Sequence, residues 1–290
     1  MSEAVYSRIT QEIMGRLEKG TVPWHRPWKR GSGFPRNLVS GGCYRGINLF
    51  VLAAQEYESP YWLTFRQAVL RGGTVRKGEK STPVVFWKWV ETEVKKLDKE
   101  ETLRLPILRY YHVFNVEQCE RIEYPKPEAL PDLKPIESAE RICMGYEDPP
   151  WIDQGTQACY RPKDDAIVMP KRERFENAEE YYSTLFHELT HSTGHEKRLA
   201  RKTLTDLCPF GSTNYSKEEL IAEMGAAMLS GEAGIENSTI DNSASYIAGW
   251  LKRLQNDDRL LIIAAGQAQR AVDHILGQKF SVEPEQALKS

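Results

Sequence analysis

Five consecutive residues, His187-Glu188-Leu189-Thr190-His191, follow the pattern H-E-x-x-H. On a helix, two histidines four positions apart project from one face and can bind a single Zn²⁺ ion. The glutamate between them lies beside the metal-bound water, where it can accept a proton. The motif therefore predicts a metal site at His187 and His191, with Glu188 as the catalytic base.

Because the motif has only three fixed positions, its surroundings decide whether it marks a metal site or an ordinary helix. Residues 179–186 contain no glycine or proline, and Leu185 and Leu189 recur at helical spacing. Gly194 is a natural stop, and basic side chains follow it, where a helix C-terminus favours positive charge. The sequence therefore predicts that the motif lies on a helix that ends near Gly194.

A catalytic zinc ion usually has three protein ligands and one water, so two histidines leave one ligand to be found. The best candidate segment is residues 216–229, an amphipathic pattern with Ser216 at the N-cap and Glu219 at the capping-box position. Glu219 and Glu223 share one face of this predicted helix with three alanines. Such small side chains would let the helix pack closely against the one that carries the motif.

An i, i+4 pair of acids on a second helix resembles the thermolysin-like gluzincins, in which the first acid binds the metal and the second orients a ligand histidine. The resemblance implies that Glu219 is the third ligand and that Glu223 supports it from outside the coordination sphere. The reverse assignment stays open. It also stays open that Glu218 and Glu219 are solvated residues of the first helical turn, where their negative charge interacts favourably with the helix dipole.

His195 is a rival ligand. The metzincin pattern H-E-x-x-H-x-x-G-x-x-H separates the glycine from the last histidine by two residues, whereas Gly194 and His195 are adjacent here. We therefore expect His195 to support the site or the fold rather than bind the metal.

The reaction class follows from the metal. Zinc lowers the pKa of its bound water, Glu188 accepts the proton, and the resulting hydroxide attacks a polarised carbonyl, so peptide hydrolysis is the expected reaction. Residues 166–170 have the pattern of a short strand, and Pro170 marks an edge or an end. We expect this edge strand to pair with an extended peptide, although a strand that merely covers the active-site helix is an equal alternative.

The N-terminal part of the chain has a different character. Residues 1–90 contain fourteen Lys or Arg and six Asp or Glu, a net charge of +8, while the whole chain carries −2. Aromatic residues interleave with this basic charge. Surfaces for single-stranded nucleic acid need both, because flat rings stack on bases while cations follow the phosphates.

Two basic, glycine-rich stretches, residues 26–46 and 71–80, are expected at the surface. We predict that nucleic acid contacts residues in or beside them: Trp24, Arg26, Trp28, Lys29, Arg30, Arg36, Tyr44, Arg45, Arg71, Arg76, Lys77 and Lys80. Two alternatives stay open. About half of the aromatic residues belong inside a domain of this size, and the basic loops could simply be solvated.

Segments along nearly the whole chain together resemble the ArdC family of plasmid antirestriction proteins, namely residues 9–12, 17–24, 27–28, 35–37, 44–48, 62–68, 73–80, 187–199 and 218–229. Their agreement in order is far more specific than H-E-x-x-H alone. The resemblance supports His187, Glu188 and His191 in the metal motif and leaves the third ligand inferred.

The resemblance implies an N-terminal domain that binds single-stranded DNA, joined to a zincin-like metallopeptidase domain with Zn²⁺ or another divalent metal such as Mn²⁺. It also implies protection of incoming plasmid DNA from type I restriction during conjugation. The implied partners are single-stranded DNA and either a type I restriction enzyme or another host protein.

Two alternatives to antirestriction stay open. The first is a DNA-tethered zinc metalloprotease that cleaves a host protein. The second is a degenerate zincin fold that acts only as a binding module. The presence of Glu188 argues against degeneracy. The sequence therefore favours a metallopeptidase without establishing its activity.

The predicted fold class is α+β with two domains. We expect a single-stranded-DNA-binding domain over residues 1–124, a proline-rich linker over 125–136 and the zincin-like domain over 137–290. Residues 107–116 are expected to form a strand that pairs with 84–90, and the charged stretch 95–104 between them is expected to be a hairpin tip or a mobile loop. Residues 245–277 are expected to be helical.

No apolar run approaches the roughly 18 to 20 residues of a membrane span, and the N-terminus lacks the apolar segment of a signal peptide. We therefore expect a cytoplasmic protein that does not bind a membrane. The five cysteines contain no C-x-x-C, so we expect reduced thiols rather than disulfides or a thiolate zinc site. They are Cys43, Cys119, Cys143, Cys159 and Cys208.

Overall fold

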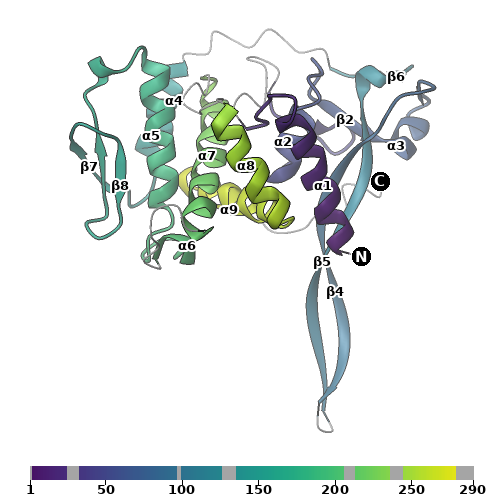
Figure 1. Cartoon of the computed structure of the whole chain (residues 1–290). Helices are drawn as coiled ribbons and strands as arrows, with labels where there is room; N and C mark the ends of the chain where they lie inside the picture. Colours follow the sequence, from purple (N-terminus) through teal and green to yellow (C-terminus); the bar gives the residue numbers. More distant parts are fainter. Residues whose placement is uncertain are drawn as a thin grey trace.

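The computed structural model describes residues 2–24, 33–96, 99–125, 135–205, 213–235 and 244–278. Helices and short sheets alternate through two domains (Figure 1). The predicted α+β class and the two-domain architecture are confirmed. The predicted nucleic-acid contacts at Arg26, Trp28, Lys29 and Arg30, and most of the predicted linker, lie outside the described residues.

The N-terminal domain is built around one four-stranded sheet. Its strands have the order β1-β2-β5-β4, with β1 parallel to β2 and the other pairs antiparallel, while β3 and β6 form a separate pair. Helix α2 is tied to the sheet by Asn48, whose side chain makes two 2.7 Å hydrogen bonds with the backbone of Val85. The elements are α1 (Ser2–Leu17), β1 (Arg36–Asn37), α2 (Ile47–Ala53), β2 (Tyr61–Thr64), α3 (Phe65–Leu70), β3 (Thr74–Val75), β4 (Thr82–Lys96), β5 (Lys99–Asn115), the 3-10 turn η1 (Val116–Gln118) and β6 (Cys119–Glu120).

Strands β4 and β5 form a long hairpin. Their antiparallel register runs from Thr82 opposite Val113 to Lys96 opposite Lys99. The far part of the hairpin projects from the body of the molecule as a two-stranded arm (Figure 1). The predicted pairing of residues 84–90 with 107–116 is confirmed. The predicted tip over 95–104 was too wide, because strand pairing continues to Lys96 and resumes at Lys99.

The C-terminal domain places a small sheet and a layer of helices around the H-E-x-x-H segment. Its sheet has the order β7-β9-β8, with β9 parallel to β7 and antiparallel to β8. The elements are α4 (Pro135–Gly145), β7 (Trp151–Gln154), β8 (Cys159–Arg161), β9 (Ala166–Met169), the 3-10 turn η2 (Arg172–Arg174), α5 (Ala178–Ser192), α6 (Lys202–Thr205), α7 (Thr213–Ala233), α8 (Ala244–Asn256) and α9 (Leu260–Ile275).

The strand expected at a sheet edge, residues 166–170, is instead the central strand of this sheet. β9 is hydrogen-bonded to β7 on one side and to β8 on the other. Pro170 follows the last strand residue, Met169, so its missing N–H interrupts no ladder hydrogen bond. The prediction that this strand pairs with a peptide is therefore wrong, because neither of its edges is free.

Two predictions about helices have different outcomes. Residues 245–277 form α8 and α9, as expected from their periodicity. Helix α7 begins at Thr213, one turn earlier than expected, so Ser216 lies inside the helix rather than at its N-cap. The predicted capping box at Ser216 is therefore wrong, and Glu218 and Glu219 belong to the second turn.

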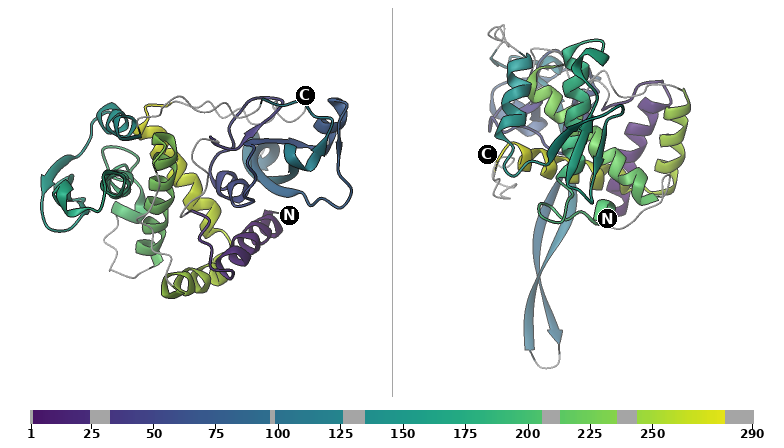
Figure 2. Two further views of the ribbon diagram at one scale, coloured as in Figure 1. Left: turned by 90° about the horizontal axis from the view of Figure 1, so that it is seen from above. Right: turned by 90° about the vertical axis from the view of Figure 1, so that its left-hand side faces the viewer.

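One apolar core extends through both domains. Helix α1 buries Ile9, Ile13 and Leu17 in the same cluster that contains Trp250 and Leu261 of α8 and α9. Figure 2 shows α1 lying beside α8, and the Thr10 hydroxyl donates a 2.8 Å hydrogen bond to the carbonyl of Asp258. The two domains therefore share packing instead of resting against each other through a polar surface.

No helix in the described parts of the chain is both long enough and apolar enough to cross a membrane.

Candidate metal centre

Helix α5 holds the motif in a fixed orientation. Asn177 caps its N-terminus by accepting a 2.8 Å hydrogen bond from the backbone N–H of Glu180. Leu185, Phe186 and Leu189 are buried in the core, so the helix cannot rotate without exposing them. The predicted helix is confirmed, and it ends at Ser192, two residues before Gly194.

Helix α7 packs closely on α5 at a glycine. A Cβ atom at Gly225 would lie 2.4 Å from Cγ2 of Thr190, a separation that real Cβ atoms do not tolerate. Three buried alanines flank this contact, namely Ala222, Ala226 and Ala227. The small residues thus allow the close approach that brings the N-terminal turns of α7 over the motif.

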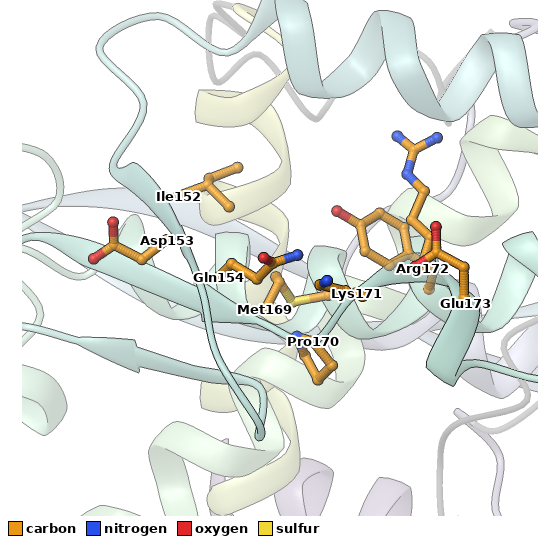
Figure 3. Close-up of a pocket in the computed structure, with 9 residues that line it drawn as sticks. Ile152, Asp153, Gln154, Met169, Pro170, Lys171, Arg172 and Glu173 are labelled. Atoms are coloured by element: carbon orange, nitrogen blue, oxygen red, sulfur yellow. The ribbon is translucent and has the colours of Figure 1, made fainter.

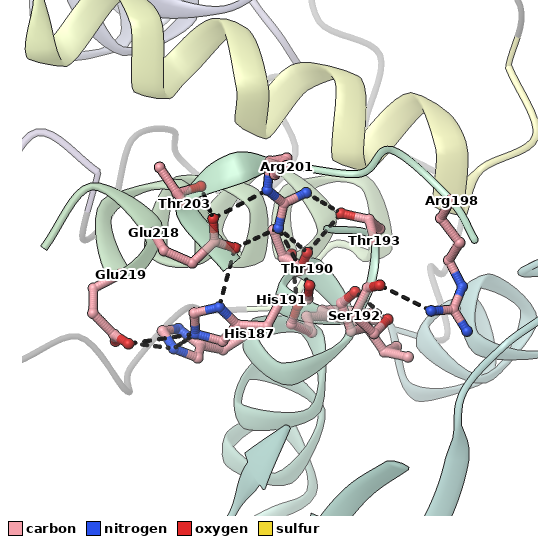
Figure 4. A network of polar contacts seen from close by, with 12 residues as sticks. His187, Thr190, His191, Ser192, Thr193, Arg198, Arg201, Thr203, Glu218 and Glu219 are labelled. Carbon is pink, nitrogen blue, oxygen red and sulfur yellow. Dashed lines mark hydrogen bonds and ion pairs between the residues drawn. The ribbon is translucent and has the colours of Figure 1, made fainter. Parts of the chain in front are cut away.

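Three side chains converge where the two helices meet (Figure 4). The Nε2 atoms of His187 and His191 are 3.1 Å apart, and the Glu219 carboxylate lies 3.5 Å from the first and 3.6 Å from the second. A tetrahedral ion with bonds of about 2.1 Å separates its ligand atoms by about 3.4 Å. The three groups therefore fit one divalent metal, with a fourth position left for water or substrate.

Glu218 fixes the ring of His191 from behind. Its carboxylate lies 3.3 Å from His191 Nδ1, so Nδ1 carries the proton and Nε2 turns toward His187 and Glu219. The guanidinium of Arg201 donates to both carboxylate oxygens of Glu218 and to the carbonyl of Thr190. This buried network joins the end of α5, the loop that follows it and α7 (Figure 4).

The same contacts set the charge of this network. Burial would raise the pKa of Glu218, but hydrogen bonds from His191 and Arg201 and the Arg201 charge lower it to about 2. Burial would lower the pKa of His191, but the hydrogen bond to Glu218 and the charges of Glu219, Glu218 and Glu188 raise it. The carboxylate therefore stays ionised at neutral pH and can orient the histidine.

Glu223 occupies a different place from the one expected. It accepts a 2.9 Å hydrogen bond from Trp24 Nε1 and a short one from the Tyr246 hydroxyl. Burial raises its pKa, and the hydrogen bonds from Tyr246 and Trp24 oppose that shift. The carboxylate that hydrogen-bonds a ligand histidine is Glu218, which sequence reasoning considered only as a solvated residue.

His195 lies outside the metal cluster. Its Nδ1 is 4.0 Å from Asp165, at the turn between β8 and β9. Arg198 binds the same carboxylate at 2.8 and 3.0 Å and donates to the carbonyl of Ser192. His195 and Arg198 thus fasten the loop after α5 to the sheet, and the support predicted for His195 is structural.

Arg201 also belongs to the network behind His191, and nothing in the sequence indicated this role. It lies in a loop ten residues beyond His191, with no motif around it. Its position becomes evident only when the loop folds back and buries the guanidinium against Glu218.

Some of the predicted nucleic-acid contacts are buried in the structure, and others are exposed. Trp24 is fully buried against Trp250, and Tyr44 is buried beside Phe86, so neither ring can stack on a base. These two predictions are wrong, because both rings serve the core. Arg45 forms an ion pair with Asp273 of α9.

The remaining described candidates differ in exposure. Arg36 is half-buried, whereas Arg71, Arg76, Lys77 and Lys80 are exposed. Arg76 binds Glu79 at 2.7 Å. The exposed basic residues therefore gather in the segment that follows α3.

A separate pocket lies at the C-terminal ends of β7 and β9 (Figure 3). It has a volume of about 570 Å³, and its lining residues are Ile152, Asp153, Gln154, Met169, Pro170, Lys171, Arg172, Glu173 and Tyr181. None of the three convergent side chains, His187, His191 and Glu219, lines it.

Known protein families match both halves of the chain. Residues 3–114 match the N-terminal domain of anti-restriction factor ArdC, and residues 138–267 match a zincin-like metallopeptidase family. The second match contains the three convergent side chains.

Curated relatives align over almost the whole chain. Two DNA primase TraC proteins from Escherichia coli are each 35% identical over 92% and 93% of this chain. The chain spans only 19% and 27% of their lengths. An uncharacterized protein, y4eC of Sinorhizobium fredii (strain NBRC 101917 / NGR234), is 35% identical over 96% of this chain and 94% of its own length.

Two solved structures are also similar to this chain over nearly its whole length. The metal-free crystal structure of the antirestriction ArdC protein from the R388 plasmid superposes with a TM-score of 0.74 and 34% identity, covering 95% of this chain and 99% of that chain. The Mn(II)-bound structure of that protein gives 0.72 and 34%, covering 94% and 97%. Because family models match both domains in order and the ArdC structures cover nearly the whole chain, this chain belongs to the ArdC family of antirestriction proteins.

Proposed function

We propose that this protein binds single-stranded DNA and protects incoming plasmid DNA from type I restriction during conjugation. Its family supports the proposal, since the solved relatives are antirestriction ArdC proteins. The observation that carries the DNA-binding part is the segment after β2. Residues 66–80 contain five Lys or Arg and one acid, a net charge of +4.

The cations of this segment are available to a ligand. Arg66, Arg71, Lys77 and Lys80 are exposed, and within the described residues none of the four has an ion-pair partner. Exposed cations bind phosphates largely by releasing counterions, so affinity that depends on them falls as salt rises.

The metal centre has the groups that peptide hydrolysis requires. A divalent ion bound by His187, His191 and Glu219 would polarise a substrate carbonyl and lower the pKa of a bound water. Glu188, between the two histidines on α5, is the group that accepts the proton. Because β9 is enclosed on both sides, an extended peptide would have to pair with β7 or β8.

The decisive experiment compares wild type with Glu188→Gln in plasmid transfer to recipients with and without a type I restriction enzyme. The variant should keep its bound metal, because Glu188 is not among the three convergent ligands. Protection that survives in a metal-loaded variant would show that proteolysis is unnecessary. Loss of protection in that folded, metal-loaded variant would eliminate the binding-module alternative.

A DNA-tethered metalloprotease that cleaves a host protein is the second candidate. The complete set of three ligands and Glu188 favours it over a degenerate fold. Under this alternative, only recipients that contain the wild-type protein would accumulate a new fragment of a host protein. Proteomic comparison of wild-type and Glu188→Gln recipients distinguishes this outcome from DNA protection alone.

Binding to matched single-stranded and duplex oligonucleotides across a salt series tests the DNA-binding part directly. Preference for the single strand, with affinity that falls steeply with salt, is expected. Equal affinity for duplex, or a flat salt response, would contradict the proposal.

A further inference from the structure

Helix α3 exposes three large apolar side chains. Phe65 is 56% exposed, Val69 52% and Leu70 66%, all on a helix of six residues. Isolated apolar residues are common on protein surfaces, but a contiguous group usually marks a binding site. The position of α3 is also informative, because it lies at the opposite end of the molecule from β7 and β8 (Figure 1).

The exposure is not the result of a loose helix. Thr64 and Gln67 form a capping box, in which each side chain accepts a hydrogen bond from the other residue's backbone N–H. Gln67 and Ala68 are buried, and Gln67 also accepts a 3.1 Å hydrogen bond from the side chain of Asn37. The inner face of α3 is thus anchored, and its apolar outer face is already in place for a ligand.

The charge around this face suits a polyanion. Arg66 lies within α3, Arg71 follows its last residue, and α3 contains no acidic residue. Both arginines are exposed and have no ion-pair partner in the described part of the chain. A purely apolar protein partner would not interact with these cations. The phosphates on either side of a base would form ion pairs with them.

Among the aromatic rings of this domain that the structure describes, Phe65 is the one best placed to meet a base. Trp24, Tyr44 and Trp62 of the same domain are buried. Tyr110 is 42% exposed, but the Arg8 guanidinium lies over its ring at 5.4 Å and His112 packs against it. Phe65 has no ring or cation partner among the described residues, so its face is open.

Resting on the proposed function, we propose that α3 is the base-stacking platform for single-stranded DNA. Phe65 stacks on an unpaired base, Val69 and Leu70 extend the apolar contact, and Arg66 and Arg71 bind the adjacent phosphates. A base within a duplex is covered on both faces by its neighbours, so this platform selects single strands. The platform is distinct from the buried rings and from the metal centre.

The test measures binding of full-length protein to a fluorescent oligothymidylate by anisotropy. Removing one stacking ring weakens single-strand binding by roughly tenfold or more, so Phe65→Ala should show a loss of this size. Phe65→Trp should restore the affinity, because an indole stacks at least as well. Trp151→Ala is the matched control, since Trp151 is a 73% exposed aromatic of the other domain, and it should leave the affinity unchanged.

The salt dependence separates stacking from phosphate contacts. Each phosphate contact on a single strand contributes about 0.7 to the slope of log affinity against log salt. The double variant Arg66→Ala/Arg71→Ala should therefore reduce the slope by about 1.4. Phe65→Ala should shift the whole line to weaker affinity with its slope unchanged.

The outcomes also separate this inference from the proposed function. If wild type binds the oligonucleotide and Phe65→Ala binds equally well, the α3 platform is wrong while DNA binding stands. If Tyr110→Ala loses the affinity instead, the bases lie on the sheet and the platform is again wrong. Failure of the wild-type protein to bind any single strand would overturn the proposed function itself.

Discussion

The metal centre and the α3 surface are built in opposite ways. The metal centre joins residues from α5, α7 and the intervening loop, and buried hydrogen bonds hold its ligands. The α3 surface comes from one short segment, residues 64–71, whose outward side chains are exposed and lie outside the core. A change at the metal centre should therefore disturb fold and chemistry together, whereas a change on α3 should affect binding alone.

The largest effect is expected when one ligand is removed. His191→Ala should reduce the bound metal from one ion per chain to none, because only His187 and Glu219 would remain. Elemental analysis after dialysis measures this directly. Retention of a stoichiometric ion would show that the metal lies elsewhere, and the comparison between the two regions would fail.

A smaller effect is expected at the carboxylate behind His191. Glu218→Gln should weaken metal binding by about 10- to 100-fold, the usual effect of losing the partner of a ligand histidine. It should also destabilise the fold, because the buried guanidinium of Arg201 loses its charged partner. Glu232→Gln, an exposed change on the same helix, is the control, and metal affinity is measured by competition with a chelator well below the melting temperature.

Close packing between α5 and α7 can be tested by adding one methyl group. Gly225→Ala places a Cβ atom against Thr190 and should lower the free energy of unfolding by about 1 to 3 kcal/mol. Gly15→Ala on α1 makes the same chemical change where no atom lies within 4 Å, and it should stabilise by about 0.4 to 1 kcal/mol. Chemical denaturation compares the pair, and equal shifts would contradict the packing argument.

The ion pair between Asp165 and Arg198, which holds the loop after α5 to the sheet, predicts that stability depends on pH. Burial would raise the pKa of Asp165, but its hydrogen bonds with Arg198 and Tyr160 and the Arg198 charge lower it below its usual range. The carboxylate therefore contributes stability above its unfolded pKa of about 3.9, and this contribution disappears as the pH falls through the folded value.

Asp165→Asn should accordingly cost on the order of 1 kcal/mol at pH 7, allowing for solvent screening. The difference from wild type should shrink as the pH falls below about 4. Thermal melting across pH measures it, with Asp164→Asn as an exposed neighbouring control. A difference that grows toward low pH would contradict the assigned ion pair.

The smallest effect is expected when the metal itself is removed. Because α3 lies at the far end of the molecule from the zincin-like sheet, chelation should change the affinity for an oligothymidylate by less than about twofold. Anisotropy titrations with and without a chelator measure this. A large change would mean that the two regions are coupled through the shared core.

The parts that could be predicted from sequence depend on local periodicity. Helix α5 and the helices α8 and α9 follow from the spacing of their apolar residues. The pairing of β4 with β5 follows from two adjacent strand patterns and a polar turn between them. The small residues of α7 also follow from the sequence, and they let this helix approach α5 closely enough for Glu219 to reach His187 and His191.

The parts that could not be predicted depend on contacts between distant segments. Trp24 has the neighbours of a nucleic-acid residue in sequence, yet its ring fills the core beside Trp250, more than two hundred positions away. β9 became central because β8 turns back beside it, and no pattern within residues 166–169 indicates that. Glu218 became the orienting carboxylate only because Arg201 folds over it.

The core shared by α1, α8 and α9 makes the chain comparable to an obligate heterodimer whose subunits happen to be covalently joined. The Trp24–Glu223 hydrogen bond and the Arg45–Asp273 ion pair cross the same junction. Cleavage between Pro125 and Pro135 should therefore leave two fragments that stay associated under native conditions. Each fragment produced alone would expose a broad apolar surface and aggregate.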